Sequence, residues 1–198
     1  MSDLNYAEIY DKLYKNGYRK SRNVSGAKLF HYMSSIVPRF NTYLDVGCGY
    51  GELVQQVSYR GDINAWGIDI AQSAIEDGAT QGLNLKQGSV TEIPFDDNSF
   101  DFVTCFDCLE HIDPDDTMKA ITELVRVTKV CLGLQICTNR TKNQFPEIIP
   151  NMHPNVKTKQ EWKGLFKLLP VRQLYYGEHK SHVHFLFTKD LLGAKQKK

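Results

Sequence analysis

The stretch Tyr43–Val54, which reads YLDVGCGYGELV, constrains the fold more than any other part of this 198-residue chain. An apolar run typical of a buried β-strand breaks into Gly47, Gly49 and Gly51, and apolar spacing typical of a helix follows. A strand, a tight turn and a helix together form the repeating unit of open α/β sheets. Glycines at such a turn let the backbone approach a ligand closely. We therefore expect an α/β fold with a ligand site at this turn.

Segments typical of strands and helices alternate along the rest of the chain. This alternation predicts an α/β fold with a doubly wound, mostly parallel sheet of seven strands, helices on both faces and an antiparallel final strand. Strands are expected at residues 42–46, 63–70, 83–88, 99–106, 129–137, 171–176 and 182–188. Helices are expected at residues 51–59, 71–80, 113–127 and 158–168.

Length and composition predict one soluble domain of ordinary size, with 41% hydrophobic and 24% charged residues. The sequence has neither an apolar run long enough to span a bilayer nor a secretory leader, so we expect a cytoplasmic protein without membrane contact. The five cysteines are an odd number and lie mostly in expected strands, which favours reduced thiols. Cys105 and Cys108 form a CxxC, but no second pair has the spacing of a zinc site.

Charge is unevenly distributed, although the net charge is only +1. Residues 1–40 hold 7 basic and 3 acidic residues, residues 41–137 hold 5 and 16, and residues 138–198 hold 12 and 4. The ends of the chain are therefore basic and its middle is acidic. Solvated lysines explain much of this pattern, but the basic ends are also the one clue to the charge of a substrate.

The residues around the glycine turn restrict the ligand. In an open α/β sheet, ligands bind beyond the carboxyl ends of the strands, where the strand order reverses. The dinucleotide fingerprint is GxGxxG, whereas here the third glycine, Gly51, comes one position early. Asp45, at the end of the strand, would repel a diphosphate but attract a cation. A ligand that combines adenosine with positive charge fits both facts, and S-adenosylmethionine carries a sulfonium and an ammonium group.

Three stretches resemble the motifs of class I S-adenosylmethionine-dependent methyltransferases. LDVGCGYGELV resembles their first motif, GIDI resembles their second, and GSVTEIPFDDNSFDFVTCFDCLEHI is similar to the region from the adenine contact through the fourth strand. The resemblance covers roughly Tyr43 to Val130 and is specific, because the motifs occur in the family's order and spacing. It implies a methyltransferase enzyme with S-adenosylmethionine as cofactor.

The resemblance also implies which residues bind this cofactor. Asp45 would lie near the methionine ammonium group, unless it only accepts hydrogen bonds from the turn, and Asp69 would accept both ribose hydroxyls. Many family members have an acidic residue where this chain has Ser89. The Ser89 hydroxyl or the backbone of Val90 would therefore bind the adenine amino group. The expected cofactor-binding residues are Tyr18, Asp45, Gly47, Cys48, Gly49, Asp69, Ile70, Ser89, Val90 and Phe106.

The stretch DCLEH is the candidate for catalysis, because a hydroxyl acceptor must lose a proton to a base or near a metal. If it forms a helical turn, Asp107, Glu110 and His111 share one face, and His153 follows from the same edge of the sheet. This arrangement loosely resembles divalent-metal methyltransferases of small-RNA 3′ ends and ubiquinone-type O-methyltransferases. It implies Mg or Mn on Asp107, Glu110 and His111, with His153 as an approximate match for a later histidine ligand. Two alternatives remain open: His111 or His153 acts as a simple base beside Asp107, or the Glu-His pair only braces the loop.

Four tyrosines recur at every fourth position of the N-terminal stretch YAEIYDKLYKNGYR. We expect residues 1–40 to form a helical segment that covers the cofactor as a lid, residues 41–190 to form the methyltransferase domain, and residues 191–198 to form a flexible basic tail. Most of the tyrosines are expected to pack on the core, with Tyr18 and Arg19 the best placed to reach the site. His179, His182 and His184, near the last strand, are expected to be structural and remote from the catalytic edge.

The sequence therefore predicts transfer of a methyl group to a hydroxyl or amine of a small molecule. The absence of [DN]PP[FY] after the fourth strand and of a Pro-Cys nucleophile argues against DNA base methylation. The alternatives are an RNA 2′-O-methyltransferase, an inactive cofactor-binding partner subunit and, least favoured, a dehydrogenase. A phosphate-bearing acceptor is one option, since basic residues would border its pocket: Arg19, Lys20, Arg22, Arg140 and Lys142.

Overall fold

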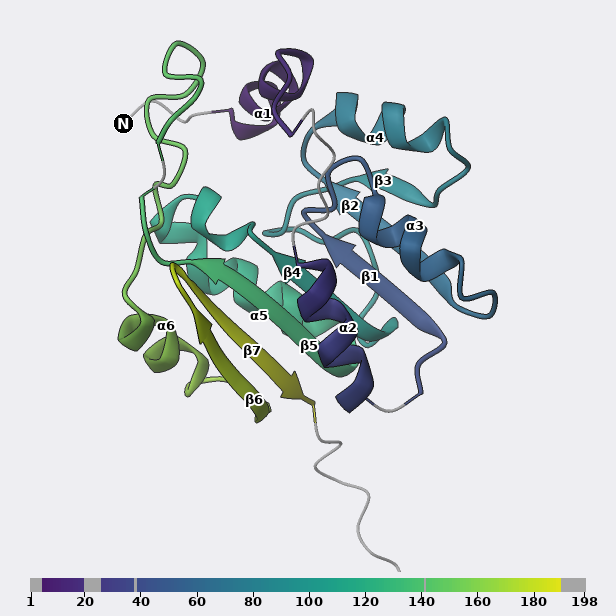
Figure 1. Cartoon of the computed structure of the whole chain (residues 1–198). Helices are drawn as coiled ribbons and strands as arrows, with labels where there is room; N and C mark the ends of the chain where they lie inside the picture. Colours follow the sequence, from purple (N-terminus) through teal and green to yellow (C-terminus); the bar gives the residue numbers. More distant parts are fainter. Residues whose placement is uncertain (1–4, 20–25, 38, 141, 190–198) are drawn as a thin grey trace, which may run out of the picture.

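The computed structural model describes residues 5–19, 26–37, 39–140 and 142–189 and consists of a seven-stranded sheet with helices on both faces (Figure 1). The strand order is β3-β2-β1-β4-β5-β7-β6, which confirms the predicted doubly wound arrangement. The strands are β1 (Thr42–Val46), β2 (Asn64–Asp69), β3 (Leu85–Gln87), β4 (Phe100–Phe106), β5 (Thr128–Cys137), β6 (Arg172–His179) and β7 (His182–Thr188).

The central strand β1 pairs in parallel with β2 on one side and with β4 on the other, so the strand order reverses between β1 and β4. The last strand, β7, lies between β5 and β6 and runs antiparallel to both. As a result, the first residue of β7 lies at the edge of the sheet where the parallel strands end. This edge carries the candidate site.

Helices cover the two faces of the sheet. Phe30 and Met33 of α2 and Leu53 of α3 pack on one face, while Ile121 of α5 and Trp162 of α6 pack on the other. The apolar face of each helix is buried because the strands between them are apolar on both sides. The helices are α1 (Tyr6–Lys15), α2 (Ala27–Ile36), α3 (Glu52–Ser58), α4 (Gln72–Ala79), α5 (Thr117–Val127) and α6 (Lys159–Phe166).

The helix expected at residues 113–127 is shorter than predicted. Asp113 accepts a hydrogen bond from the backbone N–H of Asp115 over 2.9 Å and so caps a short 3₁₀ turn, Pro114–Asp116. The α-helix proper begins only at Thr117. Aspartates and proline therefore stabilise the start of this segment as the sequence suggested, but in the tighter helical geometry.

An additional layer covers the edge of the sheet at which the parallel strands end. Tyr10 and Leu13 of α1 pack against Ala74 of α4 and against Ile149 and Met152 of the segment between β5 and α6. Figure 1 shows α1 and this segment, residues 142–157, lying together beyond the sheet. The predicted basic tail, residues 191–198, lies outside the described residues. Within the described part of the chain, none of the helices combines the length and the apolar character that crossing a bilayer requires.

Candidate active site

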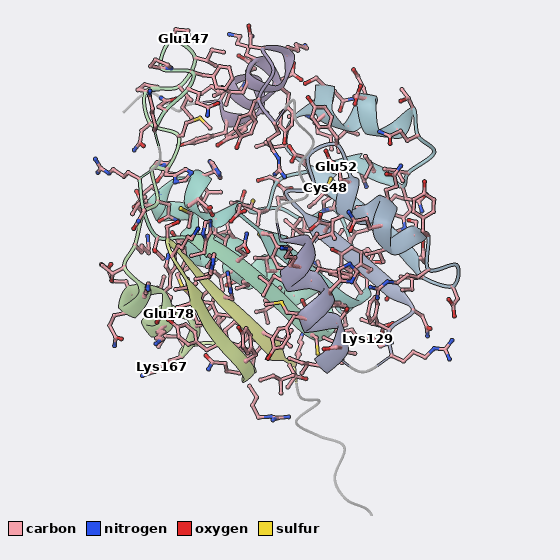
Figure 2. All side chains as sticks on the ribbon, viewed as in Figure 1. Cys48, Glu52, Lys129, Glu147, Lys167 and Glu178 are labelled. Atoms are coloured by element: carbon pink, nitrogen blue, oxygen red, sulfur yellow. The ribbon has the colours of Figure 1, made fainter. Side chains whose placement is uncertain are left out.

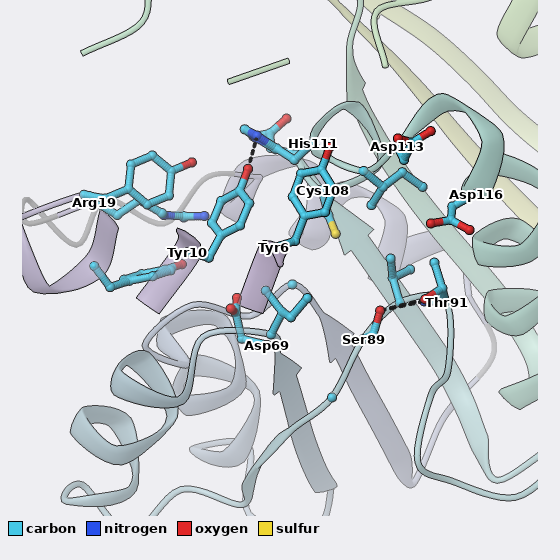
Figure 3. Close-up of a pocket in the computed structure, with 18 residues that line it drawn as sticks. Tyr6, Tyr10, Arg19, Asp69, Ser89, Thr91, Cys108, His111, Asp113 and Asp116 are labelled. Atoms are coloured by element: carbon cyan, nitrogen blue, oxygen red, sulfur yellow. Dashed lines mark hydrogen bonds between the residues drawn. The ribbon is translucent and has the colours of Figure 1, made fainter. Parts of the chain in front are cut away.

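A cavity of about 200 Å³ opens beyond the carboxyl ends of β1 and β4, where the strand order reverses (Figure 3). Six of the residues predicted to bind the cofactor line the cavity: Tyr18, Gly47, Asp69, Ile70, Ser89 and Val90. Three others, Asp45, Cys48 and Phe106, line a smaller pocket that shares Gly47 and Arg19 with the cavity.

The glycine turn is held in place by the strand that follows it. Gly47 has a φ of +78°, and a Cβ at this position would lie 2.9 Å from the Cβ of Cys108. The backbone N–H of Gly49 donates to Asp69 Oδ2 over 2.9 Å, and Asp69 Oδ1 accepts from the backbone N–H of Ala71 over 2.9 Å. Asp69 therefore joins the turn after β1 to the turn after β2 at the wall of the cavity.

Asp45 is buried behind this turn, with an exposed fraction of 6%. Its Oδ1 accepts a hydrogen bond over 2.8 Å from the hydroxyl of Thr104, which lies in the neighbouring strand β4 and not in the turn. Burial raises the pKa of the Asp45 carboxyl to about 7, although the hydrogen bond from Thr104 and the nearby Arg19 guanidinium oppose this shift. Cys48 and Glu52 line the same small pocket and lie just beyond the carboxyl end of β1 (Figure 2).

The opposite end of the cavity carries the residues expected near adenine. The hydroxyl of Ser89 lies 2.8 Å from that of Thr91 and also accepts from the Thr91 backbone N–H over 3.2 Å. Asp113 and Asp116 line the cavity across from these hydroxyls (Figure 3). Carboxylates are thus present at this end, although they come from the segment after β4 and not from position 89.

The N-terminal helix contributes more to the cavity than the sequence suggested. All of Tyr6, Tyr10, Tyr14 and Tyr18 line it, and Tyr10 and Tyr14 also belong to the buried cluster between α1 and α4. The Tyr10 hydroxyl lies 2.8 Å from His111 Nδ1 (Figure 3). The expectation that most of these tyrosines would only pack on the core is therefore too narrow.

Basic residues predicted to meet an acceptor fall into three groups. Arg19 lines the cavity. Arg140 and Lys142 are exposed in the segment that follows β5. Lys20 and Arg22 lie outside the described residues.

The stretch DCLEH forms a 3₁₀ turn, Leu109–His111, in place of the expected helical turn. Ligand atoms of Glu110, His111 and His153 lie within 4.8 Å of one another. Asp107 precedes this turn with a φ of +51°, and its carboxylate is directed elsewhere. The predicted ligands Glu110 and His111 therefore lie together with His153, the approximate further match, whereas Asp107 is not part of this group.

Hydrogen bonds decide which nitrogen of each imidazole carries the proton. His111 Nδ1 lies 2.7 Å from the carbonyl of Met152, and His153 Nδ1 lies 3.0 Å from the carbonyl of Asn139. A carbonyl can only accept, so Nδ1 is assigned as the protonated nitrogen in both rings and Nε2 carries the lone pair. The Tyr10 hydroxyl then accepts from the same Nδ1–H of His111. Imidazoles that bind metals are commonly oriented in this way by a backbone carbonyl.

Glu110 completes the donor set. Its Oε1 accepts from the backbone N–H of Cys137 over 3.1 Å, while its buried Oε2 has no hydrogen-bond partner among the described residues. Burial, followed by the nearby Asp107 carboxylate, raises the pKa of Glu110 well above its usual range. Burial and then the neighbouring His153 ring lower the pKa of His111 to about 3. A cation would offset the burial of this carboxylate, so the residues fit a divalent metal.

Sequence reasoning missed His182, which was expected to be remote from this edge. That expectation is wrong, because His182 Nε2 lies 3.4 Å from Asp107 Oδ1. The antiparallel pairing of β5 with β7 places His182 opposite Cys137, at the end of β5. The signal was available: an antiparallel last strand must begin at the edge where the parallel strands end. His179 pairs with His182 across the β6–β7 turn.

Comparison with known proteins agrees with this geometry. A family model described as "Methyltransferase domain" matches residues 44–130. Ajmaline N-methyltransferase of Rauvolfia serpentina is 40% identical over 92 residues, which are 42% of this chain and 31% of that protein. Ubiquinone biosynthesis O-methyltransferase of Neisseria meningitidis serogroup C is 29% identical over 135 residues, which are 61% of this chain and 56% of that protein.

Among solved structures, the PH0226 protein of Pyrococcus horikoshii superimposes with a TM-score of 0.68 at 18% identity, over 86% of this chain and 91% of that one. That likeness concerns the fold. The matched parts span 31% and 56% of the lengths of the two curated relatives described above. The matched domain, which covers just under half of the chain, the sheet order and the motifs at the edge of the sheet are all similar to those of class I S-adenosylmethionine-dependent methyltransferases.

Proposed function

We propose that the protein transfers a methyl group from S-adenosylmethionine to a hydroxyl of a small, anionic acceptor, with a divalent metal held by Glu110, His111 and His153. The observation that carries this proposal is the buried, unpartnered Oε2 of Glu110 beside two imidazoles whose Nδ1 protons are directed to carbonyls. Carboxylate and imidazole ligands suit Mg or Mn. An amine acceptor would need no such centre.

The donor would lie along the cavity with its two ends at different residues. Asp69 would accept hydrogen bonds from the ribose hydroxyls, and the Asp45 carboxylate would balance the positive charge of the methionine end. The residues Ser89 and Val90 would border adenine. These assignments rest on the lining of the cavity and of the adjoining small pocket.

The acceptor would enter from the side of β4 and β5. A divalent cation at this position would lower the pKa of an acceptor hydroxyl and fix its oxygen. Asp107 lines the cavity, and its carboxylate lies close enough to raise the pKa of Glu110, so it would take the proton. Methyl transfer itself needs little more than alignment, because the sulfonium is already an activated donor.

The competing reading, in which His111 acts alone as base, is less well supported. A general base works best when its pKa lies near the working pH. Burial and the His153 ring hold the pKa of His111 at about 3, far below that range. A low pKa does suit a metal ligand, since only the neutral ring binds a metal.

The test is turnover of labelled S-adenosylmethionine against pools of hydroxylated metabolites and RNA, with and without EDTA. We expect EDTA to abolish turnover, added Mg or Mn to restore it, and binding of S-adenosylhomocysteine to survive. Glu110→Ala and His111→Ala should be similarly severe, whereas His31→Ala, an exposed imidazole on α2, should have no effect. Turnover that resists EDTA but is lost in His111→Ala would refute the metal centre.

A further inference from the structure

His182 is placed by the topology next to the candidate acceptor site. It is the first residue of β7, and its register partner Cys137 is the last residue of β5. The backbone N–H of Thr138 donates to the carbonyl of Ser181 over 2.7 Å, which ties the β6–β7 turn to the start of the segment after β5. His182 is therefore fixed at the edge where β4 and β5 end.

The side chain of His182 faces Asp107. Its Nε2 lies 3.4 Å from Asp107 Oδ1, and Gln135 Nε2 donates to Asp107 Oδ2 over 2.8 Å. The backbone N–H of Asp107 also donates to the carbonyl of Gln135, over 2.9 Å. Gln135 of β5 thus hydrogen-bonds one oxygen of this carboxylate, and His182 of β7 lies within ion-pair distance of the other.

The backbone at Asp107 indicates that this arrangement is maintained against a conformational cost. Its φ of +51° lies in the left-handed region, which is unfavourable for a non-glycine residue. Such conformations persist where the surroundings over-determine them, and they cluster at functional sites. At Asp107, the surroundings are Gln135 and His182.

We propose that His182 is a positioning residue of the acceptor site, which together with Gln135 fixes the Asp107 carboxylate in the orientation that receives the acceptor's proton. This rests on the proposed function. In the step concerned, a C–O bond forms between the methyl carbon and the acceptor oxygen while the S–CH₃ bond breaks, and its electron pair stays on sulfur. The O–H bond of the acceptor breaks, and its proton passes to Asp107.

The surroundings of the ring favour this role. The titratable groups that face His182 are Asp107, Cys137, His179 and His184. A hydrogen bond with Cys137 raises the pKa of His182, burial opposes it, and the Asp107 carboxylate adds to the rise. When the ring is protonated, its Nε2 faces the carboxylate as a cation, and the 3.4 Å contact is an ion pair.

The test compares His182→Leu, His182→Gln and the control His179→Leu, whose ring lies across the turn and is exposed. We expect His182→Leu to lower kcat roughly 10-fold to 100-fold, because misplacing a catalytic group is costly. The KM for S-adenosylmethionine should change less than about twofold, since Asp107 does not hold the donor. Glutamine can still donate near the Nε2 position, so His182→Gln should recover most of kcat.

A double-mutant cycle separates positioning from packing. In an Asp107→Asn background, His182→Leu should cause no further loss, because the carboxylate it positions is already gone. Additive losses, an equal loss in His179→Leu, or no recovery in His182→Gln would each overturn the proposal.

A second measurement needs no acceptor and so distinguishes failure of this proposal from failure of the proposed function. Histidine ring NMR should show that Asp107→Asn lowers the pKa of His182 by about one unit, since an opposite charge is removed. An unchanged His182 pKa would overturn the pairing whatever the reaction proves to be.

Discussion

Among single residues, Asp45 shows how a carboxylate beside a glycine turn can favour a positively charged ligand. Its carboxylate bonds Thr104 and lies near Arg19 in a small buried pocket. We predict that Asp45→Asn weakens binding of S-adenosylhomocysteine by roughly 10-fold to 100-fold, the loss expected when a charge-assisted contact is removed. Binding of methylthioadenosine, which lacks the ammonium group, should hardly change. Isothermal titration calorimetry measures both affinities.

A matched control for this experiment is Asp69→Ala. Asp69 lies at the cavity wall where the ribose is expected, and both ligands contain a ribose. This variant should therefore weaken both ligands by a factor of about ten or more. If Asp45→Asn instead reduced both affinities equally, Asp45 would only support the turn.

Residue identities predicted which residues belong to the site better than they predicted which of these residues lie together. Glu110, His111 and His153 were all recognised, since the side chains that bind metals are few. Asp107 was grouped with them because a helical turn would have aligned the spacing i, i+3 and i+4. The observed 3₁₀ turn begins only at Leu109, and the left-handed backbone at Asp107 turns its carboxylate towards Gln135 and His182.

At the scale of elements, strands were easier to predict than the ends of helices. β1 was expected at residues 42–46 and is observed as Thr42–Val46, because a short apolar run ends at a glycine. The segment 113–127 was expected to be one helix, but Pro114–Asp116 forms a separate 3₁₀ turn. Capping residues mark where a helical segment starts, but they do not show whether its first turn is a 3₁₀ turn or an α-helical turn.

The elements that cover the cavity give a prediction of their own. Tyrosines of α1 line the cavity, and α1 packs against Ile149 and Met152 in the segment 142–157. A ligand beneath them should stabilise both elements, so S-adenosylhomocysteine should slow amide hydrogen exchange in α1 and in residues 142–157. The last strands, β6 and β7, provide the control and should change least. Uniform protection of all elements, or none in α1, would contradict a lid.

At the scale of the whole molecule, the sheet order was predictable, whereas contacts between distant strands were not. Alternating apolar runs and helices leave few arrangements for a parallel sheet. The contact of His182 with Asp107 joins residues from β7 and from the end of β4, which are not neighbours in the sheet. The antiparallel topology predicts that β7 begins at this edge of the sheet, but only the register of β7 on β5 brings His182 to Asp107.

Global stability should also reveal the buried charge at Asp45. Burial raises its pKa to about 7 in the folded protein, against an ordinary value of 3.8. A raised carboxyl pKa contributes stability that is present below the unfolded value and is lost as pH rises through the folded value. Between pH 5 and pH 8, the free energy of unfolding of the ligand-free native protein should therefore fall by roughly 3 kcal/mol more than that of Asp45→Asn.

Urea unfolding of both proteins across this pH range measures the difference, and the comparison cancels the titration of the other buried groups, which the two proteins share. The Asn variant should gain stability relative to the native protein as pH rises. Adding S-adenosylhomocysteine should remove much of this gain, because an ammonium group beside Asp45 favours its ionised form. A pH-independent difference between the two proteins would show that Asp45 is already ionised without a ligand, and the charge would then be balanced within the protein itself.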